Sequence, residues 1–283
     1  SHLEGLEKDN TGYHLPGLLA GSEGSLAVIT KARLRLHPHL EERCSAMLAF
    51  KSVGDAVSAT AQLRRSVPDL HAVEVIFREA MDLVSDYIST SIPVRSDGSA
   101  WLIVEAASSS DPTDELAQAI DDLGDLVLDV AVGHDSTSRA GLWQFREKIT
   151  EAIATRGTPH KLDVTLPASE LAEFVSRIPE IISGVDQRAT AVMFGHLGDG
   201  NVHVNVLGDD GLEPDNEVES AVLGYVAQLG GSISAEHGIG TAKKEFLHLN
   251  RSGEEIAIFR AIKSSFDPKG ILSPNTLIPA EEQ

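Results

Sequence analysis

Two histidines stand on either side of a Gly-Asp-Gly turn in the stretch AVMFGHLGDGNVHVNV, residues 191–206. Apolar runs joined by a short Gly/Asp segment are typical of a β-hairpin. We expect His196 to close the first strand and His203 to open the second, so that the two imidazoles lie across from each other. In the second strand the valines alternate with His203 and Asn205, which predicts one buried and one polar face. Asp199 is expected to form the turn rather than bind a ligand.

A second segment, SISAEHGIGTAKKEF at residues 232–246, places Glu236 and His237 among small residues. Small neighbours let a backbone approach a ligand closely. Two imidazoles and one carboxylate are a common set of catalytic metal ligands that leaves positions open for water or substrate. Nitrogen and oxygen ligands without thiolate fit Zn²⁺ best, with Fe²⁺ and Mn²⁺ as alternatives. A lone histidine is more often a hydrogen-bonded turn residue, but this set of three favours a metal site.

A third group of polar side chains could bind an anion. In LWQFREKITEAI, residues 142–153, Arg146 and Thr150 are four positions apart and would share a helix face. Arginine binds a carboxylate through two parallel hydrogen bonds, although an ordinary surface ion pair is at least as good an interpretation of the spacing. Lys161 alternates with Asp163 on one face of a predicted strand, and it is either a further anion contact or a further surface pair.

The composition narrows the class of protein. The 283 residues are 42% hydrophobic, which is enough for a substantial core. Lys and Arg total 23 against 43 Asp and Glu, and the net charge of −20 argues against nucleic-acid binding. The single cysteine, Cys44, excludes an intrachain disulfide, is expected to be buried, and favours a reducing, cytoplasmic compartment. Without a long apolar run or a signal-peptide pattern, we expect a soluble protein.

Strands and helices alternate along most of the chain, in an order that resembles a split βαβ unit and returns in the second half. This predicts an α+β fold, an antiparallel sheet with flanking helices. The Gly-rich stretch GSEGSLAVITKARLRLHP, residues 21–38, is expected to lead into one more strand. The other predicted strands cover 44–52, 71–77, 99–108, 126–133, 160–167 and the hairpin 190–207, and the helices cover 54–67, 78–87, 114–125, 138–155, 170–183, 216–231 and 254–266.

Three motifs in order, GSEGSLAVIT, FGHLGDGNVHVNV and SAEHGIG, resemble those of the FAD-dependent dehydrogenases that oxidise D-2-hydroxy acids, in the vanillyl-alcohol-oxidase superfamily. The resemblance covers nearly the whole chain and implies the fold of the FAD-linked oxidase C-terminal domain. It implies a metal site, a catalytic base, substrate contacts and FAD contacts. The metal site falls on His196, His203 and Glu236, and the catalytic base falls on His237. The substrate contacts fall on Arg146, Thr150, Lys161 and Asn205. The FAD contacts fall on Ser22, Glu23, Gly24 and Ile29.

The same resemblance implies a domain organisation. Residues 1–40 would be a remnant of the FAD-binding domain, 41–265 the substrate and metal domain, and 266–283 a segment that returns to the FAD domain. The loop that holds the FAD pyrophosphate is expected to precede the chain, so that the isolated chain should be inactive. Two positions depart from the family pattern, with Ala27 in place of a glycine and Ser273 in place of an asparagine.

The resemblance implies a small 2-hydroxy acid as substrate and an acceptor protein or a quinone as the electron acceptor, and a homodimer is a further expectation. The acid could be lactate, glycolate or 2-hydroxyglutarate. Two other functions stay open: a flavin-independent metal enzyme that uses the same two histidines and one carboxylate, which the GSEG segment argues against, and a metal-binding module without chemistry.

Overall fold

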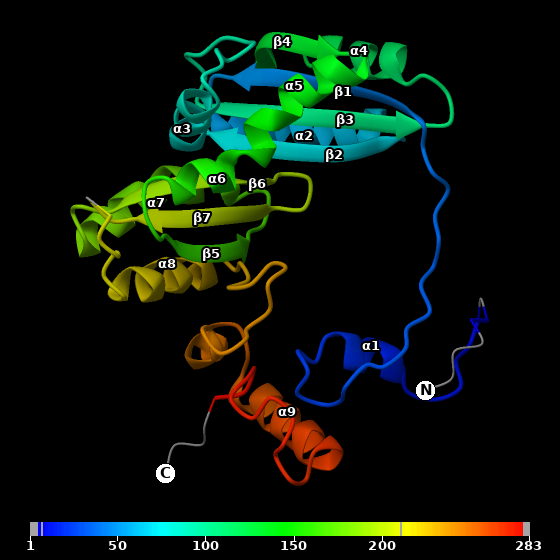
Figure 1. The fold of residues 1–283 in the computed structure, drawn as a ribbon, viewed down its shortest axis with the longest axis vertical. Coiled ribbons are helices and arrows are strands. Elements are labelled where there is room, and N and C mark those ends of the chain that lie inside the picture. Colours follow the sequence, from blue (N-terminus) through cyan, green and yellow to red (C-terminus); the bar gives the residue numbers. More distant parts are fainter. Residues whose placement is uncertain (1–4, 7, 210, 280–283) are drawn as a thin grey trace. The chain divides into compact units, whose positions relative to one another are not determined.

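A computed structural model describes residues 5–6, 8–209 and 211–279 of the chain. The chain divides into two compact units, which we describe separately (Figure 1). The larger unit comprises residues 39–235 and contains the whole sheet. The smaller unit comprises residues 1–38 together with 236–283.

The larger unit is built on a seven-stranded sheet with the order β4-β1-β3-β2-β6-β7-β5, in which every neighbouring pair is antiparallel. The predicted fold class is therefore confirmed. The hairpin of β6 and β7 joins β2 on one side to β5 on the other, so both predicted metal histidines lie inside the sheet. The strands are β1 Glu42–Phe50, β2 Leu70–Phe77, β3 Ala100–Ser108, β4 Val127–Gly133, β5 His160–Thr165, β6 Thr190–His196 and β7 Asn201–Leu207.

Helices cover both faces of this sheet (Figure 1). The face that bears the histidines packs against α3, α5 and α6 through a core that includes Trp101, Phe145 and Phe194. The valines of β7 lie on the opposite face and are completely buried, as the alternation predicted, and Cys44 is also buried. The helices of this unit are α2 Val53–Ser66, α3 Arg78–Ile88, α4 Thr113–Asp121, η1 Gly124–Leu126, α5 Ser136–Glu147, α6 Ile149–Ala154, α7 Leu171–Val185 and α8 Glu217–Gln228.

The single helix predicted over 138–155 is wrong in one respect, because the structure divides it into α5 and α6. The division occurs at Lys148, whose backbone has φ −88° and ψ −2°. The Lys148 amide still donates to the carbonyl of Gln144. This hydrogen bond is made by the residue that caps the C-terminal end of α5, before α6 begins. Neither Gly nor Pro is present at this position, so the sequence held no signal for the break.

The smaller unit contains α1 Leu15–Ala20, η2 Lys244–Leu249 and α9 Gly253–Phe266. Its distant segments are joined at Lys263 of α9, whose ammonium group donates to the carbonyl oxygens of Ser25 at 2.8 Å and Leu272 at 2.6 Å. Lys263 also pairs with Asp267, and this contact together with the backbone amide of Leu272 lowers the pKa of Asp267 to about 2. A network of charged hydrogen bonds thus holds this unit together where its apolar core is small.

The strand predicted within residues 21–38 is wrong for this chain. Residues 27–38 form no strand, and Val28 and Leu36 are 73% and 90% exposed. The sequence alternates as a strand does, but a strand exists only when its backbone amides and carbonyls bond to a neighbour. Among the described residues, no neighbouring strand pairs with this segment. The described helices also include none that is long and apolar enough to cross a membrane.

Candidate active site on the histidine face of the sheet

The hairpin holds its two histidines diagonally rather than directly opposite each other. In the ladder between β6 and β7, His196 pairs with Asn201 and His203 pairs with Phe194. The expectation that the histidines oppose each other is therefore wrong by two residues, because the four-residue turn 197–200 begins the second strand at Asn201. Diagonal neighbours on one face remain within reach of long side chains. The two imidazole rings meet at right angles, with centroids 5.2 Å apart.

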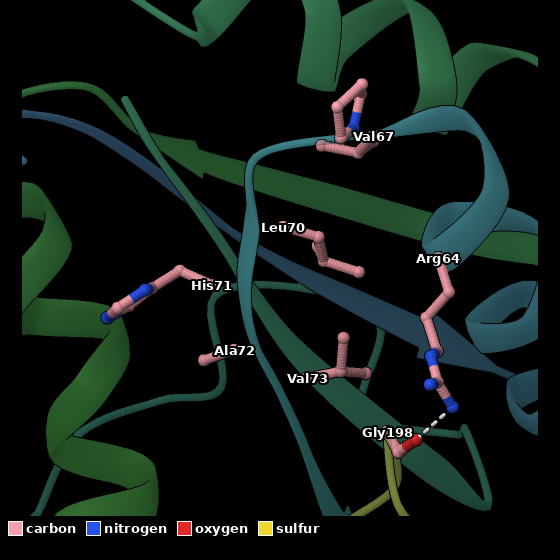
Figure 2. A pocket seen from close by; sticks show the side chains of 8 residues that line it. Arg64, Val67, Leu70, His71, Ala72, Val73 and Gly198 are labelled. Carbon is pink, nitrogen blue, oxygen red and sulfur yellow. Dashed lines mark hydrogen bonds between the residues drawn. The ribbon is translucent and has the colours of Figure 1, made fainter. Parts of the chain in front are cut away.

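The turn that separates the strands is firmly anchored. Asp199 accepts a hydrogen bond from the Asn201 amide at 3.1 Å, so its predicted role as a turn former is confirmed. Gly200 has φ +82°, and a Cβ there would lie 2.4 Å from the Leu166 carbonyl oxygen, so only glycine fits. The guanidinium of Arg64 on α2 donates to the carbonyl of Gly198, beside a small cavity of about 240 Å³ (Figure 2). These contacts fix the end of β6, where His196 lies.

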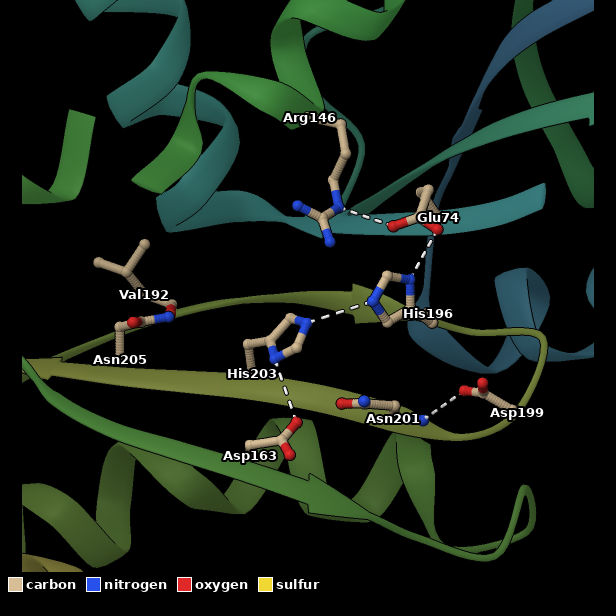
Figure 3. A network of polar contacts seen from close by, with 9 residues as sticks. All are labelled: Glu74, Arg146, Asp163, Val192, His196, Asp199, Asn201, His203 and Asn205. Carbon is tan, nitrogen blue, oxygen red and sulfur yellow. Dashed lines mark hydrogen bonds and ion pairs between the residues drawn. The ribbon is translucent and has the colours of Figure 1, made fainter. Parts of the chain in front are cut away.

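A carboxylate lies behind each imidazole, and Figure 3 shows the resulting row of side chains. His196 Nδ1 is 2.7 Å from Glu74 Oε1, and His203 Nδ1 is 3.3 Å from Asp163 Oδ1. A carboxylate beside Nδ1 favours the tautomer with its proton there, which leaves the lone pair on Nε2. The two Nε2 atoms point toward each other and are 3.4 Å apart.

This distance suits a shared metal ion. Two nitrogen atoms that each lie about 2.0–2.1 Å from a tetrahedral Zn²⁺ are about 3.3–3.4 Å apart. The carboxylate behind each ring is the usual outer contact of a metal-binding histidine, because it fixes the ring's orientation and makes Nε2 more basic. The distance between the two Nε2 atoms is therefore the one that a shared metal ion such as Zn²⁺ requires.

Glu74 on β2 is a site residue that the sequence analysis missed. Its Oε1 contacts His196, and its Oε2 accepts a hydrogen bond from Arg146 Nε at 2.7 Å. Burial alone would raise the pKa of Glu74, but the hydrogen bond from His196 and the positive charge of Arg146 outweigh it and lower the pKa. Glu74 is thus a buried anion that joins a predicted substrate residue to a predicted metal ligand. The signal for it was a single acid inside the apolar run HAVEVIF.

Arg146, in the last turn of α5, lies over the ring of Phe194 at 4.5 Å from the ring centroid. Its side chain is 15% exposed, and its Nε atom is bound to Glu74. In the part of the chain that the structure describes, its two terminal nitrogens have no hydrogen-bond partner. They form the fork that binds a carboxylate through two parallel bonds. The carboxylate of Glu74 therefore orients the guanidinium, and the two terminal nitrogens are suited to bind the carboxylate of a ligand.

The other predicted substrate residues differ in their surroundings. Lys161 and Asn205 pair in the ladder between β5 and β7, on the same face as His203. Asn205 is 6% exposed, and its amide donates to the Val192 carbonyl at 3.4 Å. Thr150 is exposed on α6, beyond the break that separates it from Arg146. Lys161, Asn205 and both histidines thus share one face of the sheet. Arg146 lies over Phe194 on that face, while Thr150 lies on a different helix from Arg146.

Asn201, which the sequence analysis also overlooked, lies on this face opposite His196. It is 2% exposed, and neither oxygen nor nitrogen of its side-chain amide has a hydrogen-bond partner among the described residues. Leaving such a group unpaired costs roughly 1–3 kcal/mol. The face beside the histidine pair therefore contains an amide that the described protein groups do not satisfy, as expected for a surface that binds a polar molecule.

The remaining predicted residues belong to the smaller unit. Glu236 and His237 are exposed in the loop at its second segment, directly after Ala235 in the chain. A cavity of about 430 Å³ lies in this unit. Its lining includes all four residues for which the resemblance implies FAD contacts, together with both departures from the family pattern: Ser22, Glu23, Gly24, Ile29, Ala27 and Ser273. Ser273 has φ +38°, a backbone region that asparagine adopts more readily than serine.

Comparison with known proteins agrees with this fold. Residues 39–277 match the family described as FAD linked oxidases, C-terminal domain. The mitochondrial D-2-hydroxyglutarate dehydrogenase of Arabidopsis thaliana is 32% identical over 97% of the chain and 50% of its own length. The D-2-hydroxyglutarate dehydrogenase of Stutzerimonas stutzeri is 30% identical over 97% of the chain and 61% of its own length. The chain thus spans about half to three fifths of the length of these relatives.

Solved structures show the same fold at low sequence identity. An alkyldihydroxyacetonephosphate synthase superimposes with a TM-score of 0.63 at 15% identity, over 94% of this chain and 50% of that one. The 4-ethylphenol oxidase of Gulosibacter chungangensis gives a TM-score of 0.60 at 12% identity, over 87% of this chain and 55% of that one. With most of its length matched by the family model, the chain belongs to the FAD-linked oxidases, and residues 39–277 form their C-terminal domain.

Proposed function

We propose that the chain is the substrate- and metal-binding part of an FAD-dependent dehydrogenase that oxidises a D-2-hydroxy acid to the 2-oxo acid. The observation that most supports this is the pair of imidazoles whose Nε2 atoms are 3.4 Å apart, each with a carboxylate at Nδ1. Membership of the FAD-linked oxidases supports the cofactor. The relatives named D-2-hydroxyglutarate dehydrogenases make that acid the first substrate to test.

In this proposal His196, His203 and Glu236 hold the metal ion, with Zn²⁺ preferred over Fe²⁺ or Mn²⁺. These residues would hold the ion where it lowers the pKa of the substrate's 2-hydroxyl group. His237 accepts the hydroxyl proton on its imidazole as the general base, the role that the motif resemblance implies for it, while Glu236 serves as the metal ligand.

The substrate's carboxylates are bound by Arg146 and Lys161, with Thr150 and Asn205 as further contacts. Two cations suit a dicarboxylate such as 2-hydroxyglutarate better than lactate or glycolate, which have one carboxylate. Glu74 holds Arg146 by its Nε atom, so the open end of the guanidinium enters binding already oriented. Because the guanidinium is already oriented, less conformational entropy is lost when the substrate binds.

The cavity lined by Ser22, Glu23, Gly24 and Ile29 is our candidate for part of the flavin site. Bound FAD would accept the hydride that leaves the substrate's C2 carbon. An acceptor protein or a quinone that reoxidises the flavin, a homodimeric assembly and a cytoplasmic location remain predictions of the same proposal.

A substrate screen on the flavin-loaded enzyme, meaning the full-length protein that includes the FAD-binding domain, tests the proposal. Under anaerobic conditions we expect D-2-hydroxyglutarate to bleach the flavin absorption band, and its L-enantiomer, D-lactate and glycolate to do so more slowly. Arg146→Ala should raise the concentration of acid needed for bleaching. If no 2-hydroxy acid bleaches the flavin, the proposed reaction is wrong. Oxidation that persists after flavin removal would instead favour a flavin-independent metal enzyme.

A further inference from the structure

Glu23 joins two segments of the smaller unit that are more than 200 positions apart in the sequence. Its Oε1 accepts a hydrogen bond from the amide of Ile239 at 2.9 Å, and its Oε2 accepts one from the amide of Gly240 at 2.7 Å. Hydrogen bonds to an ionised carboxylate are roughly twice as strong as those between neutral groups. Both oxygens of the side chain are therefore engaged by the backbone of one loop.

The backbone on each side is shaped for this contact. Glu23 has φ +51°, which is uncommon for a residue with a side chain. Gly238 has φ +72°, and a Cβ there would lie 2.6 Å from Glu23 Oε1. Any side chain at position 238 would thus both strain the backbone and push the carboxylate away. The glycine of the SAEHGIG motif is explained by the approach of Glu23.

The loop that Glu23 binds is the one that contains Glu236 and His237. Both of these residues are exposed, and the first bonded amide follows His237 by two positions. Beyond it, the Gly240 carbonyl accepts from the Leu277 amide at 2.9 Å. The loop is therefore held at residues 239 and 240, between the GSEG turn and the C-terminal segment, all within one unit.

We propose that Glu23 is a positioning residue that holds the Glu236–His237 segment in one conformation through the amides of Ile239 and Gly240. Its role as a positioning residue rests on the proposed function, in which Glu236 binds the metal ion and His237 accepts a proton. Glu23 also belongs to the turn that lines the candidate flavin cavity. The geometry of the loop that contains Glu236 and His237 is in this way tied to the turn beside the candidate flavin cavity, and Glu23 acts on the metal and the proton transfer only through this loop.

The first test measures the two hydrogen bonds directly, without any activity. Hydrogen exchange of the Ile239 and Gly240 amides is compared in the parent chain, Glu23→Gln and Glu23→Ala. Glu245→Gln is the matched control, since Glu245 lies in the same unit with an exposed side chain. We expect exchange to accelerate roughly tenfold or more in Glu23→Ala, and less in Glu23→Gln, which retains one acceptor oxygen. Unchanged exchange in both variants overturns the proposal.

The second test separates a positioning role from a merely local one. We expect Glu23→Ala to weaken Zn²⁺ binding about tenfold or more. In the flavin-loaded enzyme it should lower kcat while the KM for the hydroxy acid stays near the parent value, because Arg146, Lys161 and Asn205 lie in the other unit. Faster exchange with parent-like Zn²⁺ affinity and kcat contradicts positioning. Loss of flavin with unchanged amide exchange would assign Glu23 to flavin binding, and this result also overturns the proposal.

The two proposals can fail separately. A flavin-loaded full-length parent protein that neither binds Zn²⁺ nor oxidises a hydroxy acid refutes the proposed function, and with it the positioning role of Glu23. The exchange rates of the Ile239 and Gly240 amides still decide whether Glu23 holds the loop.

Discussion

Glu74 on β2 and Arg146 on α5 form an ion pair in which Nε and Oε2 are 2.7 Å apart, although 72 positions separate them in the sequence. The two side chains are 10% and 15% exposed. The other oxygen of Glu74 contacts His196, so a single carboxylate orients both the guanidinium and the imidazole. The larger unit thus links its candidate anion-binding and metal-binding groups through one buried acid.

Replacing this acid should affect both stability and metal binding. Glu74→Gln keeps the shape but removes the charge, which leaves Arg146 buried without a counter-ion. Breaking a buried ion pair typically costs roughly 3–5 kcal/mol, and loss of an outer contact weakens metal binding about 10- to 100-fold. Urea unfolding and Zn²⁺ titration measure the two effects. Glu79→Gln on the exposed side of α3 is the matched control, and equal behaviour of the two variants would count against the role of Glu74.

His203→Ala should abolish tight metal binding. It removes one of the two Nε2 atoms that lie 3.4 Å apart, and His196 alone cannot replace it. We expect affinity to fall by orders of magnitude, measured as metal content after dialysis against a chelator. His134→Ala, which removes an exposed histidine from the same unit, should retain the metal content of the parent chain. Equal metal content in all three proteins would exclude the site.

Glu236 and His237 are expected to differ in what their loss removes. In the flavin-loaded enzyme, His237→Ala should retain its metal and its substrate affinity but lose turnover by roughly 10²–10⁴, the usual contribution of a general base. Glu236→Ala should lose metal and activity together. Metal analysis and steady-state kinetics on both variants distinguish the two roles. Loss of metal from His237→Ala as well would show that this assignment of ligand and base is wrong.

The smaller unit should lose stability in acid through Asp267. Its pKa is lowered to about 2 by Lys263 and by the amide of Leu272, so the ionised form stabilises the folded state. That contribution is complete above the unfolded pKa of about 3.9 and is lost as the pH falls through about 2. In the parent chain, the urea concentration at the midpoint of unfolding should fall as the pH is lowered between these two values. The fall should be smaller in Asp267→Asn, which is less stable at neutral pH, and a variant that follows the parent at every pH would refute this.

The order of the elements could be predicted because period-two and period-3.6 patterns are local properties of the sequence. The polar face of β7 followed from the same alternation, and it correctly placed His203 and Asn205 together. The diagonal offset of His196 could not be predicted, because it depends on which turn residue begins the second strand. The break at Lys148 had no local signal at all.

Glu74 and residues 27–38 are two cases in which the sequence alone was not sufficient for a correct prediction. Glu74 was overlooked because the reason for an acid in an apolar strand lies in its partners, Arg146 and His196, which are distant in sequence. A strand was predicted within residues 21–38 because the pattern there suits one, yet pairing requires a second backbone. Local patterns indicate which element a segment can form, and contacts far along the chain decide whether it forms and what its side chains do.

The exposed segment 27–38 should also affect how the chain behaves at high concentration. Val28, Ile29, Leu34 and Leu36 are each more than half exposed, and the backbone beside them is in no strand. An unpaired segment with a strand-like pattern is a template for association between copies. The net charge of −20 opposes this through mutual repulsion, which vanishes near the isoelectric point of 4.8. Precipitation should therefore begin as the pH approaches that value, and replacing Leu34 and Leu36 by lysine should delay it.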